Sequence, residues 1–144
     1  MNDKPIMLIE DNPDDRDLTI RALKKNNILN PVIVASNGAE ALDMLLGDDQ
    51  RDQGNPALIL LDLKLPKIEG LEVLRRIRAD ERTQVVPVLV LTSSKEEADL
   101  RAAYQLGANA YVRKPVAFSE FSEAIHTVGL FWLHLNEPPP DPPP

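Results

Sequence analysis

The chain alternates short, uninterrupted apolar runs with longer stretches in which apolar residues recur every three or four positions. The third apolar run, residues 57–61, ends abruptly at Asp62. A short run of this kind is typical of a strand that is buried on both faces, as in a parallel sheet. Asp62 would then lie at the carboxyl end of a central strand, where open α/β sheets bind their ligands. Taken alone, Asp62 fits a turn cap equally well.

Four further apolar runs complete a repeating order of strand and helix. The predicted strands are residues 6–9, 31–35, 57–61, 87–91 and 110–112. An amphipathic helix is predicted after each: from Pro13 to Asn26, from Asn37 to Gly47, through Leu71, Leu74 and Ile77, from Ser94 to Leu106, and from Phe118 to Leu133. This alternation indicates βαβ units, hence an α/β fold with a doubly wound parallel sheet. The polar residues 47–56 predict a loop.

Several helix starts carry capping signals. Asn12 suits an N-cap and Pro13 the first helical position, and two Asp residues follow them. A capping residue with Glu three positions later recurs at Asn37/Glu40 and Ser94/Glu97. These signals place the predicted helix starts directly after the strand ends.

Length and composition narrow the class of protein. A chain of 144 residues with 43% hydrophobic content predicts one globular domain, residues 1–135, followed by a Pro-rich tail, residues 136–144. We expect this tail to be disordered rather than docked. The absence of Cys excludes disulfides and thiolate metal sites, and we expect a cytoplasmic protein with no membrane span. The net charge of -7 argues against a nucleic-acid-binding surface.

Chemically useful side chains follow four of the predicted strands. They are Glu10 and Asp11, Asp62, Thr92, and Lys114. Because the carboxyl ends of parallel strands share one edge of the sheet, these groups should converge there. Three gathered carboxylates stay ionised together only beside a cation, and oxygen ligands of this kind suit Mg²⁺. A metal and a Lys that neutralise phosphoryl oxygens, with a carboxylate that attacks phosphorus, would perform phosphoryl transfer.

At these residues the sequence resembles the receiver domains of two-component response regulators, over residues 4 to about 130. The resemblance implies a flavodoxin-like (βα)5 fold with strand order 2-1-3-4-5. It implies that Asp62 is the phosphoacceptor, and that Mg²⁺ is bound by Asp62, by Asp11, by Glu10 through water and by the backbone carbonyl of Lys64. It also implies that Lys114 pairs with the phosphoryl group through a chain turn with a cis bond to Pro115, that Thr92 follows the phosphoryl group, and that Tyr111 is an aromatic switch.

Finer features resemble the small single-domain regulators that partner bacterial phytochromes. They are Asn12-Pro13-Asp14-Asp15, the long loop before the third strand, Leu65-Pro66-Lys67 and Phe131-Trp132. The resemblance implies a histidine kinase as partner, with a bacterial phytochrome as its type. Because only one helix and the tail follow Lys114, we expect the output to be a protein contact or a phosphate relay, and not an enzymatic activity.

The last predicted helix carries more apolar residues than one face can bury. Phe121, Ile125, Val128 and Trp132 form one stripe, whereas Leu130, Phe131, Leu133 and Leu135 lie off it. We predict a homodimer through Phe131, Trp132, Leu133 and Leu135, because contiguous exposed apolar surface marks interfaces. The alternative is that the tail folds back over them. His126 and His134 are expected to be surface groups.

Other classes fit less well. A hydrolase of the haloacid dehalogenase type, a Mg²⁺-dependent phosphatase, needs a second acid two residues after the nucleophile, where this chain has Lys64. A flavin module would need a hydroxyl-rich and Gly-rich phosphate loop after the first strand. A receiver-like scaffold that binds a partner without phosphorylation remains the main alternative.

Overall fold

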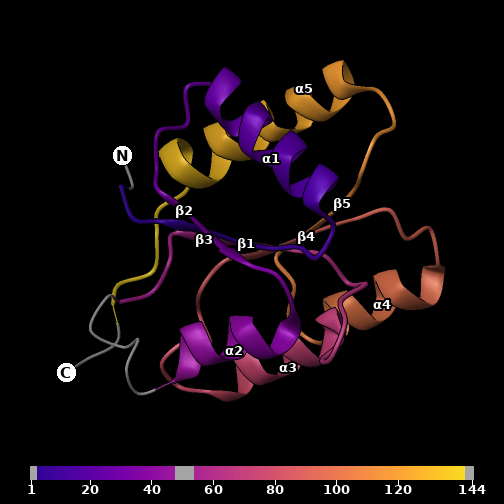
Figure 1. Cartoon of the computed structure of the whole chain (residues 1–144). Helices are drawn as coiled ribbons and strands as arrows, with labels where there is room; N and C mark the ends of the chain where they lie inside the picture. The colour runs from indigo at the N-terminus through magenta and orange to yellow at the C-terminus, as the bar shows by residue number, and fades with distance from the viewer. Residues whose placement is uncertain (1–2, 48–53, 142–144) are drawn as a thin grey trace.

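The computed structural model describes residues 3–47 and 54–141, along which five strands alternate with five α-helices (Figure 1). The strands are β1 (Ile6–Ile9), β2 (Val32–Ala35), β3 (Leu58–Leu61), β4 (Val88–Thr92) and β5 (Ala110–Arg113). The helices are α1 (Pro13–Lys25), α2 (Gly38–Leu46), α3 (Gly70–Ala79), α4 (Glu97–Gln105) and α5 (Phe118–Gly129), and a π-helix, η2 (Leu130–Leu135), continues α5. The predicted order of elements is confirmed. Most of the predicted loop at residues 47–56 lies outside the described residues.

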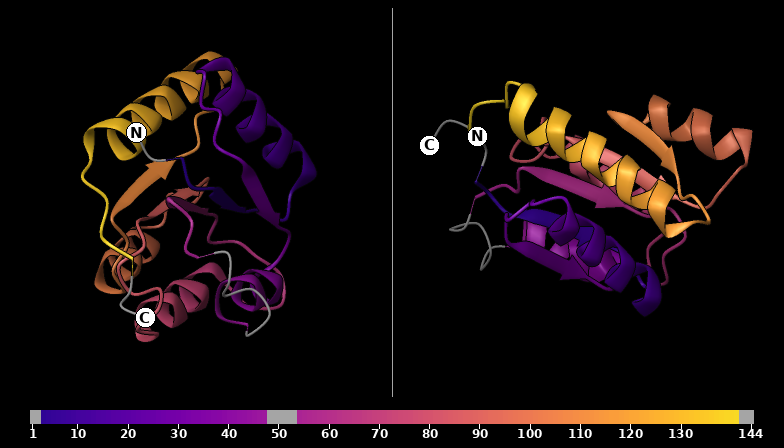
Figure 2. Two further views of the ribbon diagram at one scale, coloured as in Figure 1. Left: turned by 90° about the vertical axis from the view of Figure 1, so that its left-hand side faces the viewer. Right: turned by 90° about the horizontal axis from the view of Figure 1, so that it is seen from above.

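The strands form one parallel sheet in the order β2-β1-β3-β4-β5, which confirms the predicted topology. Helices α1 and α5 cover one face, and α2, α3 and α4 cover the other (Figures 1 and 2). The chain thus has three layers, with the sheet in the middle.

Both faces of the sheet are buried, which explains why its strands are uninterrupted apolar runs. Alternate residues of β1 and β3 belong to two separate cores because side chains in a strand alternate between faces. Met7, Ile9, Ile59 and Leu61 pack on the side of α2 and α3, and Ile6, Leu8, Leu58 and Leu60 on the side of α1 and α5.

The capping predictions are confirmed at two helices and wrong at a third. The Asn12 side chain accepts from the amides of Asp14 and Asp15, and the Asn37 side chain accepts from that of Glu40. Helix α4, however, begins at Glu97 with Glu96 at its N-cap and no side-chain cap.

The end of the last helix corrects part of the predicted interface. In η2 the Asn136 amide donates to the Phe131 carbonyl five residues earlier, at 2.6 Å. Leu133, within this segment, lies in the core beside α1 and α5, where it is 3% exposed. Leu133 therefore offers no surface to a partner. Trp132 is half-buried against the same core, whereas Leu130, Phe131 and Leu135 are exposed, and the rings of Phe131 and Trp132 meet edge to face.

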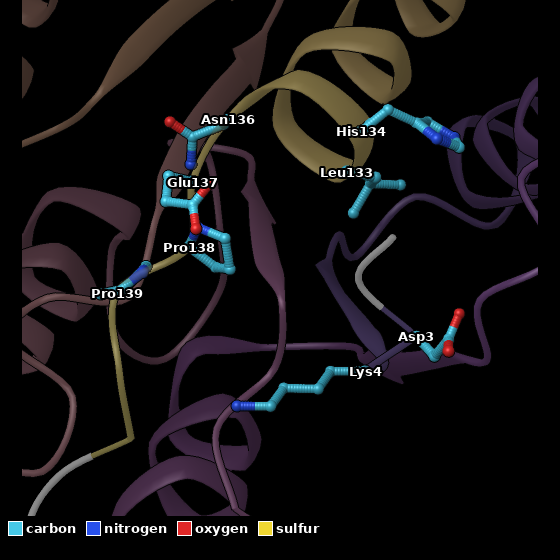
Figure 3. Close-up of a pocket in the computed structure, with 8 residues that line it drawn as sticks. All are labelled: Asp3, Lys4, Leu133, His134, Asn136, Glu137, Pro138 and Pro139. Carbon is cyan, nitrogen blue, oxygen red and sulfur yellow. The ribbon is translucent and has the colours of Figure 1, made fainter.

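Residues 136–141 form no helix or strand but lie against the amino ends of the strands, whereas we expected a disordered rather than docked tail. Lys4 forms an ion pair with Asp141, and Pro138, Pro139 and Pro140 face Asn55 and Val86 across a shared hollow. A neighbouring open cavity of about 570 Å³ is lined by Asp3, Lys4, Leu133, His134 and residues 136–139, which Figure 3 shows. This cavity lies at the amino ends of the strands, at the opposite end of the sheet from Glu10, Asp11, Asp62 and Lys114. His126 and His134 are exposed, as predicted.

None of the helices in the described part of the chain combines the length and apolar character needed to cross a membrane.

Candidate functional site

The register of the sheet brings the acidic residues together. Ile9 of β1 pairs with Leu61 of β3, so Glu10 and Asp62 occupy equivalent positions one residue beyond two neighbouring strands. The Asp62 amide donates to the Ile9 carbonyl at 3.1 Å, which extends the ladder to this point. The backbone of both residues is thereby held by the hydrogen bonds of the sheet, which places their side chains next to each other.

Glu10, Asp11 and Asp62 form the predicted acidic cluster. Each contributes one carboxylate oxygen to a group whose members lie within 4.8 Å of one another. Glu10 and Asp62 are buried, and Asp11 is exposed at the mouth of the cluster. Carboxylate oxygens are hard ligands of the kind that Mg²⁺ takes, either directly or through its bound waters. The gathered donor set therefore suits one small divalent cation.

Lys114 joins this cluster from the end of β5. Its Nζ donates to Glu10 Oε1, to Asp62 Oδ2 at 3.2 Å, and to Asp15 Oδ2 at 3.0 Å. The Lys114 amide donates to the Thr92 carbonyl at 2.8 Å, which ties this side chain to β4. Asp15 is a site residue that the sequence reasoning missed. Its only sequence signal is its place in the Asn12-Pro13-Asp14-Asp15 motif, which predicts a helix start and is part of the resemblance to small single-domain regulators.

Burial and mutual contact shift the acid–base properties of the cluster. Burial raises the pKa of Glu10 to about 7, against the opposing hydrogen bond from Lys114, and the negative charge of Asp62 adds to the increase. Burial by itself lowers the pKa of Lys114. The hydrogen bond to Glu10 and the charges of Asp62 and Glu10 outweigh it, so the pKa lies above its ordinary value. Lys114 is therefore a permanent cation, and a second cation beside Glu10 would favour the ionised form of this acid.

Both oxygens of Asp62 have a hydrogen-bond donor. Oδ1 accepts from the Lys64 backbone amide at 3.2 Å, and Oδ2 accepts from Lys114. The Lys64 side chain is exposed. An open groove of about 400 Å³ borders the cluster at Asp11 and is further lined by Leu63, Lys64, Leu65, Pro66, Glu69, Leu71 and Asp99. Asp62 is thus oriented by two donors, and an open groove begins beside it at Asp11.

The predicted switch residues, Thr92 and Tyr111, both form hydrogen bonds with Ser94 rather than with the acidic cluster. The Ser94 amide donates to Thr92 Oγ1 at 3.3 Å, and the Tyr111 hydroxyl donates to the Ser94 carbonyl at 3.4 Å. The Ser94 hydroxyl in turn donates to Asp99 Oδ2 at 2.6 Å. Ser94 therefore links the end of β4, the ring of Tyr111 and the first turn of α4.

The bond between Lys114 and Pro115 differs from the expectation, since no peptide bond in the described residues is cis. A trans bond before proline is the intrinsically preferred form, by about 0.5–1 kcal/mol. The contacts of Lys114 with the three acids are made with this bond in the trans form.

Comparison with known proteins gives one consistent family. Residues 6–126 match the model of the response regulator receiver domain. The response regulator Rcp1 of Synechocystis sp. is 35% identical over 131 residues, which cover 90% of this chain and 89% of Rcp1. The Mn²⁺-bound form of Rcp1 superposes with a TM-score of 0.86 and 33% identity, covering 95% of this chain and 99% of that one.

Two other solved structures are similar over nearly the whole chain. The bacteriophytochrome response regulator RtBRR is 53% identical with a TM-score of 0.75, covering 96% of this chain and 86% of that one. The phosphorylated cyanobacterial phytochrome response regulator RcpA is 34% identical with a TM-score of 0.90, covering 96% of this chain and 100% of that one.

Proposed function

The chain belongs to the response regulator receiver family, and from this membership we propose that it accepts a phosphoryl group on Asp62 from a histidine kinase. The observation that carries the proposal is the environment of Asp62. This carboxylate lies at the end of β3 beside Glu10 and Asp11, with Lys114 on one oxygen and an open groove bordering the cluster at Asp11. An attacking carboxylate needs this combination of orientation, access and nearby positive charge.

The proposed reaction transfers phosphorus from nitrogen to oxygen. A carboxylate oxygen of Asp62 attacks the phosphorus of a phosphohistidine, and the bond between phosphorus and the imidazole nitrogen breaks. The electron pair of that bond stays on the imidazole, which takes up a proton from solvent. Lys114 exchanges its hydrogen bond with Asp62 Oδ2 for one with a phosphoryl oxygen, and so neutralises charge that builds up there.

Mg²⁺ is the cofactor that we propose for this site. Asp11 and Asp62 would hold it directly and Glu10 through water, and the Lys64 carbonyl would complete the protein ligands. When bound, the ion would neutralise phosphoryl oxygens. The spacing of the three carboxylates and the raised pKa of Glu10 support the assignment, and a relative, Rcp1, has been solved with Mn²⁺.

Signalling would follow from the added charge. A phosphoryl group on Asp62 would attract the Thr92 hydroxyl, the loop after β4 would follow, and Tyr111 would turn inward. Thr92 and Tyr111 are both hydrogen-bonded to Ser94, and the Ser94 hydroxyl is hydrogen-bonded to Asp99 in α4. A movement of Thr92 or Tyr111 would therefore act on α4 through Ser94. The surface made by α4, β5 and α5 would change shape and alter binding of a partner protein.

The partner kinase is proposed to be a bacterial phytochrome, because RtBRR and RcpA are both phytochrome response regulators. The chain would act in the cytoplasm as a phosphoacceptor signalling protein and not as a classical enzyme. Its net charge of -7 favours protein partners over nucleic acid. A phosphotransfer profile against a panel of histidine kinases tests this assignment, and fastest transfer from a kinase other than a phytochrome would refute it.

We propose that residues 1–135 form the receiver unit, that residues 136–144 form a tail, and that two chains associate through η2. Leu130, Phe131 and Leu135 are between 46% and 68% exposed, and Trp132 lies half-buried beside them. Pairing two copies would remove this apolar surface from water. Sedimentation of the Phe131→Ser, Leu135→Ser variant should give a monomer where the parent chain gives a dimer. An unchanged dimer would place the interface elsewhere.

Replacing Asp62 by Asn tests the phosphoacceptor assignment. With acetyl phosphate or a competent kinase as the phosphodonor, the parent chain should take up one phosphoryl label per chain in Mg²⁺. It should take up none in excess chelator. Asp62→Asn should abolish labelling, whereas Asp14→Asn, at an exposed acid nearby, should preserve it. Stoichiometric labelling of the Asp62 variant would refute the assignment. A parent chain that neither takes up phosphate nor responds to beryllofluoride would instead be a phosphorylation-independent scaffold.

A further inference from the structure

Lys114 has a third acceptor that plays no part in the acidic cluster. Asp15, the third residue of α1, places Oδ2 3.0 Å from Lys114 Nζ. An ammonium group has three hydrogens. Glu10, Asp62 and Asp15 therefore each receive one, and the side chain of Lys114 is held from three directions.

The three acceptors differ in what happens to them during the proposed reaction. Glu10 and Asp62 belong to the group of oxygens within 4.8 Å of one another that fits a cation, whereas Asp15 does not. Asp62 also becomes the ester to phosphorus. Asp15 is consequently the one acceptor of Lys114 among the described residues that neither a metal nor the phosphoryl group would occupy.

The structure fixes Asp15 in this position. Its amide donates to the Asn12 side chain at 3.2 Å, and its carbonyl accepts from Thr19 Oγ1 at 2.8 Å. Pro13 fixes the first helical position before it. The Asp15 side chain is 37% exposed against 10% for Lys114, so it contacts the buried ammonium from the solvent side of the site.

We propose that Asp15 is a positioning residue, which holds the Lys114 ammonium over Asp62 while the phosphoryl group is transferred and resident. The inference rests on the proposed function. Lys114 would approach a metal ion of like charge in the loaded site, and Asp15 offsets that repulsion. Without Asp15 the flexible Lys114 side chain would leave the site more often, and fewer encounters with a phosphodonor would react.

The test compares Asp15→Asn with Asp14→Asn, which removes the same charge from the neighbouring, exposed residue of α1. With acetyl phosphate and saturating Mg²⁺, Asp15→Asn should lower the maximal labelling rate about tenfold, as expected for the loss of one charge-assisted hydrogen bond. Asp14→Asn should change it less than about threefold, and the acetyl phosphate concentration at half-maximal rate should change little in both. In a Lys114→Ala background, Asp15→Asn should have no further effect because its partner is gone.

A second measurement does not depend on phosphorylation. In protein that carries ¹⁵N-lysine and is bound to Mg²⁺ and beryllofluoride, NMR should detect a slowly exchanging Lys114 ammonium in the parent chain and in Asp14→Asn. This signal should be lost in Asp15→Asn. Equal rates in the two Asn variants, or an undiminished effect of Asp15→Asn without Lys114, would overturn the proposal. Labelling that persists in Asp62→Asn would instead refute the proposed function, and the inference would fall with it.

Discussion

The ammonium of Lys114 lies 3.2 Å from Oδ2 of Asp62, and so connects the end of β5 to the end of β3 across β4. The donor that a phosphoryl oxygen would need is therefore already in place before phosphorylation. Three carboxylates, from Glu10, Asp15 and Asp62, accept hydrogen bonds from this one cation, and Asp11 lies beside Glu10 and Asp62. The site thus carries excess negative charge, which a divalent cation would relieve.

Burial of Glu10, aided by the negative charge of Asp62, should make the metal-free protein less stable as the pH rises. The pKa of Glu10 is about 7 in the folded chain against 4.5 when exposed, so the folded state binds more protons between these values. The unfolding free energy should fall from below pH 4.5 to above pH 7, by an amount on the order of 3 kcal/mol for this group. Urea unfolding in chelator at pH 5 and pH 8 measures the change.

The contribution of Glu10 can be isolated from that of the other acids. Glu10→Gln cannot titrate, so its unfolding free energy should depend less on pH over this range than that of the parent chain. Mg²⁺ should reduce the same dependence in the parent chain, because a bound cation replaces the proton. Identical pH profiles of parent and variant in chelator would contradict the role given to burial of Glu10.

Gly70 should tolerate no side chain, because it packs directly against the backbone that carries Asp62. A Cβ at this position would lie 2.4 Å from the Asp62 carbonyl oxygen and 2.5 Å from the Leu63 Cα. Gly70→Ala should therefore lower the unfolding free energy by roughly 2–4 kcal/mol and greatly reduce Asp62 labelling, since backbone cannot move aside cheaply.

Gly54 supplies the control for this prediction. A Cβ there would have no atom of the described residues within 4 Å, although its φ of +73° disfavours Ala. Gly54→Ala should cost about 1–2 kcal/mol through backbone strain alone and leave labelling intact. A similar loss of labelling in both variants would show that general destabilisation, not displacement of Asp62, explains the result.

The fold and most of the site follow from one property of the sequence. Five apolar runs too short for helices and unbroken by polar residues had to be buried strands, and the carboxyl ends of parallel strands share one edge. This predicts the neighbourhood of Glu10, Asp11, Asp62 and Lys114 without any three-dimensional information. Their position at strand ends makes the prediction insensitive to errors of one residue in the strand boundaries.

The sequence pattern does not predict where the side chains of Asp15 and Leu133 lie, and the cause is the same for both. Asp15 reaches Lys114 from a helix, and its direction depends on how α1 lies over the sheet, which periodicity does not encode. Leu133 lies off the predicted apolar stripe, and its burial depends on how α5 and η2 pack beside α1. Docking of residues 136–141 likewise depends on distant partners such as Lys4.

Ser94 should hold the first turn of α4 through its hydroxyl. This group donates to Asp99 and accepts from the Glu96 amide at 3.3 Å, and Ser94 is buried. Ser94→Ala should lower the unfolding free energy by about 1–2 kcal/mol, as expected for buried polar groups that lose their partner. Hydrogen exchange of the Asp99 and Leu100 amides should also become faster. The exposed Ser93, changed to Ala, is the matched control, and equal exchange rates in both variants would contradict this role.

Leu133 and Leu135 should differ sharply in their contribution to stability, although both are leucines of the same π-helix. Leu133 is 3% exposed within the core beside α1 and α5, whereas Leu135 is 68% exposed. Leu133→Ala should therefore cost about 2–5 kcal/mol through lost burial and a residual cavity. Leu135→Ala should change stability by less than about 0.5 kcal/mol at concentrations where the chain is monomeric. Chemical unfolding of both variants at low protein concentration measures the difference. A larger loss for Leu135→Ala would mean that η2 packs in the opposite orientation, with Leu135 toward the sheet.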